Sequence, residues 1–187
     1  MDRQEATKRF YDWIWPHRAA VLRTAQILCN DVHMAEDLAQ ETMIKAFSAI
    51  ERFTPGSNAK GWMLTILRNC RIDGLRATAS AAIEVSLEQL SSEPAGVEIN
   101  AEEASLDSPQ DVLNRFSDQQ VIDALQQLPE EIRWTLLLVD VQGLDQRDTA
   151  EILEVPVGTI KSRAHRGRAM LRETLLPVAK ERRLLRE

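Results

Sequence analysis

The chain has 187 residues, a formal net charge of -6 and 44% hydrophobic residues, which is enough for one ordinary domain or two small ones with real cores. No apolar run approaches the roughly 18 residues of a membrane-spanning helix, and the N-terminal MDRQEATKRF lacks the apolar core of a secretory signal, so we expect a cytoplasmic protein without membrane insertion. Cys29 and Cys70 lie in different helical patterns with no CxxC motif or Cys/His cluster near them, which indicates buried, reduced thiols and no metal site.

Residues 1–76 carry apolar side chains at helical spacing. Pro16 interrupts the first helical stretch, and a second apolar stripe over residues 34–50 predicts another helix. The turn at residues 54–58, TPGSN, ends that helix, and Ser57 or Asn58 is placed to cap the next one. One face of this next helix is apolar. Its other face is basic and carries Lys60, Arg68, Arg71 and Arg76.

Residues 77–115 are strongly acidic, with one Lys or Arg against eight Asp or Glu. They are rich in Ala, Ser and Glu, contain two prolines and show no sustained apolar stripe, which predicts a flexible linker. The sequence shows no useful strand-like alternation. We therefore expect an all-α protein with two small helical domains, residues 1–76 and 116–187, joined by the acidic linker 77–115.

Residues 116–187 have the punctuation of a helix-turn-helix. Residues 117–120 and Pro129 mark two helix starts, Gly143 ends the second helix, and Asp145 is placed to cap a short helix, QRDTAEIL. A tight turn then leads into a basic helix. Ala150 and Ile160 fall where the motif needs a small residue and an apolar residue. The turn position usually taken by glycine is Glu154, at a cost of about 1 kcal/mol if it is left-handed.

The basic helix, PVGTIKSRAHRGR over residues 156–168, has the features of a DNA-reading helix. Helical geometry groups Lys161, Ser162, His165 and Arg166 toward a major groove, and the amides at the helix start can face a phosphate. The basic side chains cannot all face one way, so some should contact phosphate and others base edges. The predicted contact residues are Gly158, Thr159, Lys161, Ser162, Arg163, His165, Arg166 and Arg168.

The stretch from LPEEIRW at residue 128 through PVGTIKSRAHRGR resembles region four of the extracytoplasmic-function (ECF, group IV) sigma factors, which reads the minus-thirty-five promoter element. The stretches AEDLAQETMIKAFSAIERF (35–53) and WMLTILRNCRIDGLR (62–76) resemble region two of the same family. Two residues depart from the family pattern: Glu154 replaces the usual turn glycine, and Thr149 replaces the usual isoleucine.

The resemblance implies partners for the remaining surfaces. It implies that Asp37, Gln40 and Glu41 dock on core RNA polymerase, and that region two recognises and melts promoter DNA at the minus-ten element. The residues assigned to the minus-ten element are Gly56, Ser57, Asn58, Lys60, Arg68, Asn69, Arg71 and Arg76. The linker is then expected to imitate nucleic acid in a cationic polymerase channel, or to act as a plain spacer. No catalytic group, cofactor or metal is expected, and the sequence leaves open whether a cognate anti-sigma factor exists.

Two other functions remain open at this stage. A stand-alone helix-turn-helix regulator would need only the second domain and would have no use for the polymerase-docking residues. A sigma-like decoy that binds an anti-sigma factor and never touches DNA would have no use for the basic reading helix.

Overall fold

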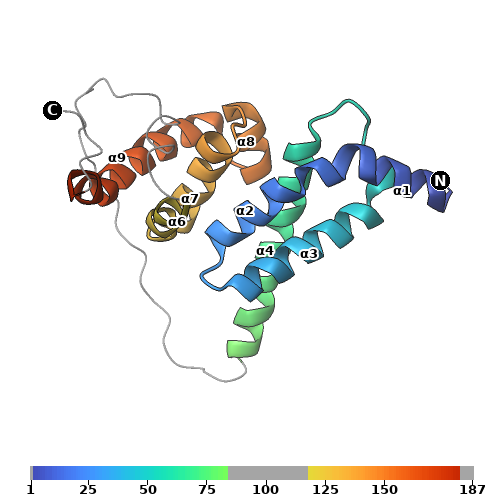
Figure 1. The fold of residues 1–187 in the computed structure, drawn as a ribbon, viewed down its shortest axis with the longest axis horizontal. Coiled ribbons are helices and arrows are strands. Elements are labelled where there is room, and N and C mark those ends of the chain that lie inside the picture. Colours follow the sequence, from blue (N-terminus) through green and yellow to red (C-terminus); the bar gives the residue numbers. More distant parts are fainter. Residues whose placement is uncertain (1, 84–117, 182–187) are drawn as a thin grey trace.

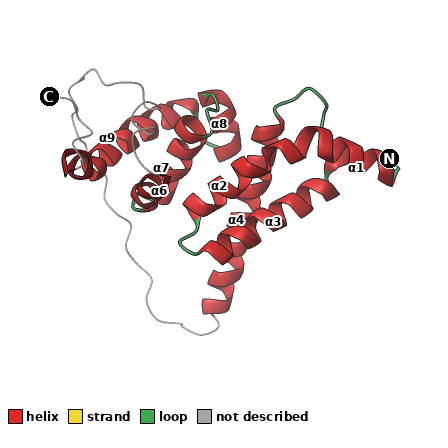
Figure 2. Ribbon diagram, viewed as in Figure 1, coloured by secondary structure: helices red, strands yellow, loops and turns green. Residues whose placement is uncertain are grey.

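The computed structural model describes residues 2–83 and 118–181. Within these ranges the chain forms helices joined by short turns, with no strand, which confirms the all-α prediction (Figure 2). The predicted linker lies largely outside the described residues. Residues 77–83, which we assigned to the start of the linker, are described and continue a helix of the first domain. The limits of the linker remain a prediction.

Residues 2–83 form an N-terminal bundle. Pro16 lies in a 3-10 turn between helices, as the sequence predicts, and the Asp31 side chain caps the following helix by accepting a hydrogen bond from the Met34 amide at 2.9 Å. The elements are α1 (Arg3–Arg9), the π-helical turn η1 (Phe10–Ile14), the 3-10 turn η2 (Trp15–His17), α2 (Arg18–Leu28), α3 (Val32–Ser48), the 3-10 turn η3 (Ile50–Arg52) and α4 (Ala59–Ile83).

Residues 118–181 form a C-terminal bundle in which the long α9 packs along α7 and α8. Pro129 is the N-cap of α7, with φ -51° and ψ 140°, one position before the first helical residue that we expected it to occupy. The elements are α6 (Asp118–Gln126), α7 (Glu130–Leu136), the π-helical turn η4 (Leu137–Val141), α8 (Gln146–Leu153) and α9 (Val157–Glu181).

The two bundles pack against each other (Figure 1). Helix α2 contacts α6 and α7, and α4 contacts α8. The buried apolar side chains of both bundles belong to one hydrophobic core cluster. Its fully buried members include Ile27 and Leu67 of the first bundle and Leu136 and Ile160 of the second. The basic face of α4 therefore lies next to the C-terminal bundle.

Candidate nucleic-acid interface

Helix α8 begins at the cap that the sequence predicts. The Asp145 side chain accepts hydrogen bonds from the amides of Arg147 and Asp148 at 2.8 and 2.7 Å. Thr149, which departs from the family pattern, is fully buried, and its hydroxyl donates to the Asp145 carbonyl oxygen at 2.7 Å. The hydroxyl is thus satisfied locally, so the core tolerates threonine at this position.

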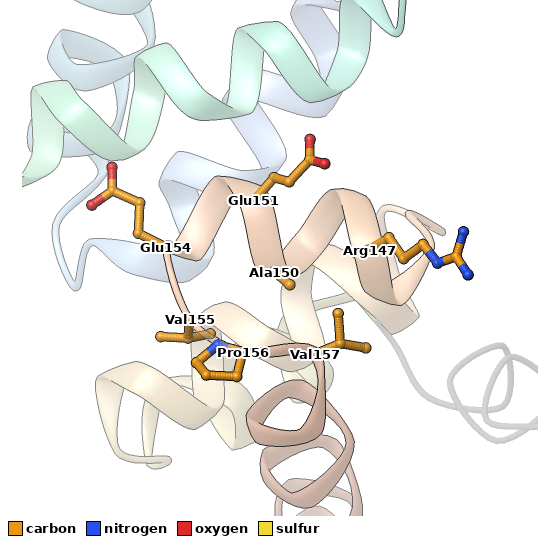
Figure 3. Close-up of a pocket in the computed structure, with 7 residues that line it drawn as sticks. All are labelled: Arg147, Ala150, Glu151, Glu154, Val155, Pro156 and Val157. Atoms are coloured by element: carbon orange, nitrogen blue, oxygen red, sulfur yellow. The ribbon is translucent and has the colours of Figure 1, made fainter.

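The turn between α8 and α9, which Figure 3 draws, closes as a Schellman motif. Glu154 has φ 57° and ψ 41°, so it adopts the left-handed conformation that the sequence left open for this position. The amides of Glu154 and Val155 donate to the carbonyl oxygens of Glu151 and Ala150 at 3.3 and 3.1 Å. The hydrogen bonding of the turn is complete without glycine, and the conformational strain on a side-chain-bearing residue remains.

An open hollow of about 550 Å³ lies at this turn and belongs to the helix-turn-helix. In Figure 3 the side chains of Glu151 and Glu154 point to the same side, toward α4. The hollow is lined by Arg147, Ala150, Glu151, Glu154, Val155, Pro156 and Val157.

Helix α9 has an exposed polar face and a buried face. The side chains that helical geometry assigns to the major groove, Lys161, Ser162, His165 and Arg166, are all exposed. The opposite face is buried, and its residues are Ile160, Ala164, Gly167, Leu171 and Leu175. Burial of Ala150 and Ile160 agrees with their predicted roles in the motif.

Gly167 sets how closely α9 approaches α7. A Cβ at this position would lie 2.6 Å from Ile132 Cγ2 and 2.8 Å from Leu136 Cδ1, well inside normal van der Waals contact. Leu136 is fully buried. The glycine therefore lets α9 approach α7 more closely than a residue with a Cβ could without a shift of these side chains.

Two of the arginines predicted to contact DNA are paired with acids of their own bundle. Arg163 binds Glu131, and Arg168 binds Asp140 through Nε at 3.0 Å and Nη2 at 2.7 Å. The hydrogen bond to Asp140 raises the pKa of Arg168. The Asp140 side chain is only 9% exposed, which identifies this bidentate pair as a contact that orients α9 on the bundle.

The loop before α4 presents the predicted polar side chains. Gly56 has φ 84°, a conformation that favours glycine, and the Ser57 hydroxyl donates to the Thr54 carbonyl oxygen at 2.7 Å. Asn58 caps α4, because its Oδ1 accepts a hydrogen bond from the Gly61 amide at 2.9 Å. Of the two caps that the sequence allows, the structure therefore uses Asn58.

The acidic residues of α3 lie on one exposed face. Asp37, Gln40 and Glu41 are all exposed, and Glu41 pairs with Lys45 at 2.9 Å. Ile44 lies one turn further along the same face and is 59% exposed. The sequence analysis missed Ile44 as a candidate contact residue, although its spacing of four from Gln40 and three from Glu41 is a usable signal.

Comparison with known proteins identifies the two bundles. Residues 14–81 match the family model described as sigma-70 region 2, and residues 118–171 match that of sigma-70 region 4. The ECF RNA polymerase sigma factor EcfG of Rhodopseudomonas palustris is 32% identical over 150 residues, which cover 77% of this chain and 72% of EcfG. The chain belongs to the ECF RNA polymerase sigma factors.

Two further similarities extend over most of the chain. The sigma factor SigE of Mycolicibacterium smegmatis is 34% identical over 172 residues, or 92% of this chain, but these residues span only 63% of SigE. A crystal complex of the sigma factor RpoE with the anti-sigma factor NepR from Bartonella quintana contains a similar chain, with 31% identity and a TM-score of 0.67. The match covers 90% of this sigma factor and 97% of that chain.

The structure brings four of the predicted minus-ten residues of region two, the N-terminal bundle, against region four, the C-terminal bundle. Asn58 Nδ2 donates to Asp148 Oδ2 at 2.7 Å, and Lys60 donates to the Gln142 carbonyl oxygen. The other two are Arg68, which donates to the Leu153 carbonyl oxygen at 3.4 Å and pairs with Glu154 at 3.4 Å, and Arg71, whose Nε lies 3.9 Å from a Glu130 carboxylate oxygen.

The remaining residues that the sequence analysis predicted to contact the minus-ten element, Gly56, Ser57, Asn69 and Arg76, are exposed. Nothing in the sequence pattern indicates the contacts that the other four predicted residues make with region four, because each contact joins residues more than 50 positions apart. These four residues are Asn58, Lys60, Arg68 and Arg71. Among the described residues, no helix is long and apolar enough to cross a membrane, and no cluster of potential metal ligands is present.

Proposed function

We propose that this sigma factor binds core RNA polymerase and directs it to promoters, reading the minus-thirty-five element with α9 and opening the minus-ten element with α4 and the loop before it. The exposed groove face of α9 on a firmly packed helix-turn-helix is the observation that carries this proposal. The factor itself supplies recognition and no catalytic step, and it acts in the cytoplasm with the polymerase. The similarity to RpoE, solved with NepR, supports an anti-sigma factor as a further partner.

Run-off transcription with and without purified core polymerase tests the function as a whole. We expect a promoter-specific transcript only when both proteins are present. Promoter binding by the chain alone, without any transcript when core polymerase is added, would indicate a stand-alone helix-turn-helix regulator. Binding to neither polymerase nor DNA would indicate a decoy for an anti-sigma factor.

Recognition at the minus-thirty-five element rests on Lys161 and Arg166, which are both exposed. Replacing either with Ala should cost about 1–3 kcal/mol at that element if the side chain reads a base, and an equal amount at all sequences if it binds phosphate. Titration of promoter variants at fixed salt separates the two cases. Lys8→Ala, an exposed lysine of α1, is the matched control for loss of one positive charge.

Opening of the minus-ten element rests on the loop and the basic face of α4. An extruded base needs polar groups that hold it, and the displaced strand needs positive charge. Asn69→Ala is the sharpest test because Asn69 is exposed and is not among the residues that contact region four. We expect normal closed complexes, weaker permanganate reactivity at the minus-ten element and recovery on a pre-melted template. Undiminished opening on duplex DNA would contradict the role of Asn69.

Docking on polymerase rests on the α3 face of Asp37, Gln40, Glu41 and Ile44. Asp37→Lys combined with Gln40→Ala should abolish binding to core polymerase without unfolding region two, because substitutions at exposed polar positions change stability by only about 0.5 kcal/mol. Glu36→Lys is the control: it reverses the neighbouring charge on the same helix, about 100° around the helix axis. If the double variant and the Glu36→Lys control bind core polymerase equally in a pull-down, this face of α3 does not dock on polymerase.

A further inference from the structure

Two ion pairs join α9 to other parts of region four, and they differ in how far they are exposed. Arg168 pairs with Asp140, whose side chain is almost fully buried, so this pair belongs to the packed part of the bundle. Arg163 pairs with Glu131, whose side chain is 69% exposed. An ion pair at such an exposed carboxylate contributes little to stability. The first pair therefore orients α9, whereas another anion could replace Glu131 in the second.

Arg163 lies at the edge of the groove face of α9. Three residues span about 300° of a helix, so Arg163 lies about 60° around the axis from the exposed Arg166. At this edge a basic side chain is placed for a phosphate of the DNA backbone rather than for a base in the groove. In the structure its guanidinium instead donates to Glu131 Oε2, a carboxylate of the same chain.

Glu131 is placed beside α9 by the start of α7. It lies in the first turn of α7, where the unpaired amides and the dipole of the helix favour an acidic side chain. If a phosphate took Arg163 from it, the Glu131 carboxylate would remain unpaired beside negatively charged DNA. The exchange therefore has two costs, namely loss of the ion pair and repulsion between the carboxylate and the phosphate.

We propose that Glu131 is a positioning residue for DNA binding: it holds Arg163 away from the phosphates that flank the minus-thirty-five element and so lowers the affinity of α9 for DNA of any sequence. The inference rests on the proposed function of α9. A phosphate contact releases counterions and adds nearly the same affinity at every sequence. With Arg163 withheld, a larger share of the affinity comes from side chains that face bases, and binding depends more on the anchoring that core polymerase supplies.

Glu131→Gln in the full chain tests this proposal, because it removes the charge of the carboxylate and keeps the size of the side chain. The matched control is Glu151→Gln, an exposed acid of α8 whose side chain points toward α4 (Figure 3). Fluorescence anisotropy measures binding to two duplexes, one with the minus-thirty-five element and one of unrelated sequence, at about 50 and 200 mM salt. Circular dichroism verifies that each variant remains helical.

We expect Glu131→Gln to bind both duplexes on the order of tenfold more tightly than wild type at about 50 mM salt, because Arg163 then reaches a phosphate. One additional phosphate contact makes the dependence of log affinity on log salt steeper by about 0.9, so the gain should fall to about threefold at 200 mM salt. Glu151→Gln should leave this salt dependence as it is in wild type.

The same substitution in an Arg163→Gln background separates restraint of the arginine from repulsion by the carboxylate. The gain should disappear in this background, because no guanidinium remains at position 163 to reach the phosphate. A gain of equal size would overturn the proposal, since Glu131 would then act on DNA directly. Unchanged affinity and salt dependence of Glu131→Gln alone, or a gain confined to the duplex with the minus-thirty-five element, would also overturn it.

Lys161→Ala in the same assay separates failure of this inference from failure of the proposed function. If Lys161→Ala weakens binding while Glu131→Gln changes nothing, α9 binds DNA and Glu131 does not restrain Arg163. If neither substitution changes binding, α9 does not bind DNA, and both the proposed function of α9 and this inference are wrong.

Discussion

Replacing Glu154 with Gly should stabilise region four. Glu154 has φ 57°, and a left-handed conformation costs a residue with a side chain about 1–2 kcal/mol. The greater conformational freedom of glycine in the unfolded chain offsets about 0.4–1 kcal/mol of the strain that the substitution relieves. We therefore expect a net increase of about 0.5–1 kcal/mol in the free energy of unfolding. The same change removes the ion pair with Arg68, but the Glu154 side chain is 76% exposed, so the pair contributes little.

Glu154→Ala separates the two effects because it removes the carboxylate and keeps the Cβ. Urea unfolding of the full chain, followed by circular dichroism, should give the Gly variant a free energy of unfolding about 1 kcal/mol higher than that of the Ala variant. In thermal unfolding this difference corresponds to a melting temperature roughly 2–4 °C higher. Glu151→Gly, inside α8, should instead destabilise by about 1 kcal/mol. Equal stability of the Gly and Ala variants at position 154 would refute the reasoning, because it would show that the strain of the left-handed turn is no larger than the cost of the greater freedom of glycine in the unfolded chain.

Two further predictions concern the core. Gly167→Ala places a Cβ 2.6 Å from Ile132 Cγ2, so this variant should be about 1–3 kcal/mol less stable than Gly74→Ala. Gly74→Ala is the control because it gains the same helix propensity, and a Cβ at position 74 has no neighbouring atom within 4 Å. Equal urea midpoints for the two variants would contradict this prediction. Burial raises the pKa of the Cys29 and Cys70 thiols. Because the thiolate is the reactive form, both thiols should resist alkylation by iodoacetamide at about pH 7.5 until the chain unfolds. Rapid alkylation of the native protein, detected by mass spectrometry, would show that the two thiols are not buried.

The sequence by itself determined the all-α class, several helix starts and the family. Asp145 as a cap, position 154 as the turn between the two helices and the exposed polar face of α9 all follow from local signals, because capping, turn closure and helical spacing involve residues only a few positions apart. The match of residues 14–81 and 118–171 to regions two and four agrees with the motifs read from the chain.

Only the tertiary structure decided which partners the polar side chains take. Arg168 was predicted to contact DNA and is paired with Asp140, 28 positions away, and Gln142 bonds the Ala20 carbonyl oxygen across 122 positions. Such contacts depend on how two helices cross and on which surfaces the bundles bury together. Because an arginine or glutamine has the same local propensity whether its partner is a phosphate, a carboxylate or a carbonyl oxygen, no local pattern distinguishes these partners.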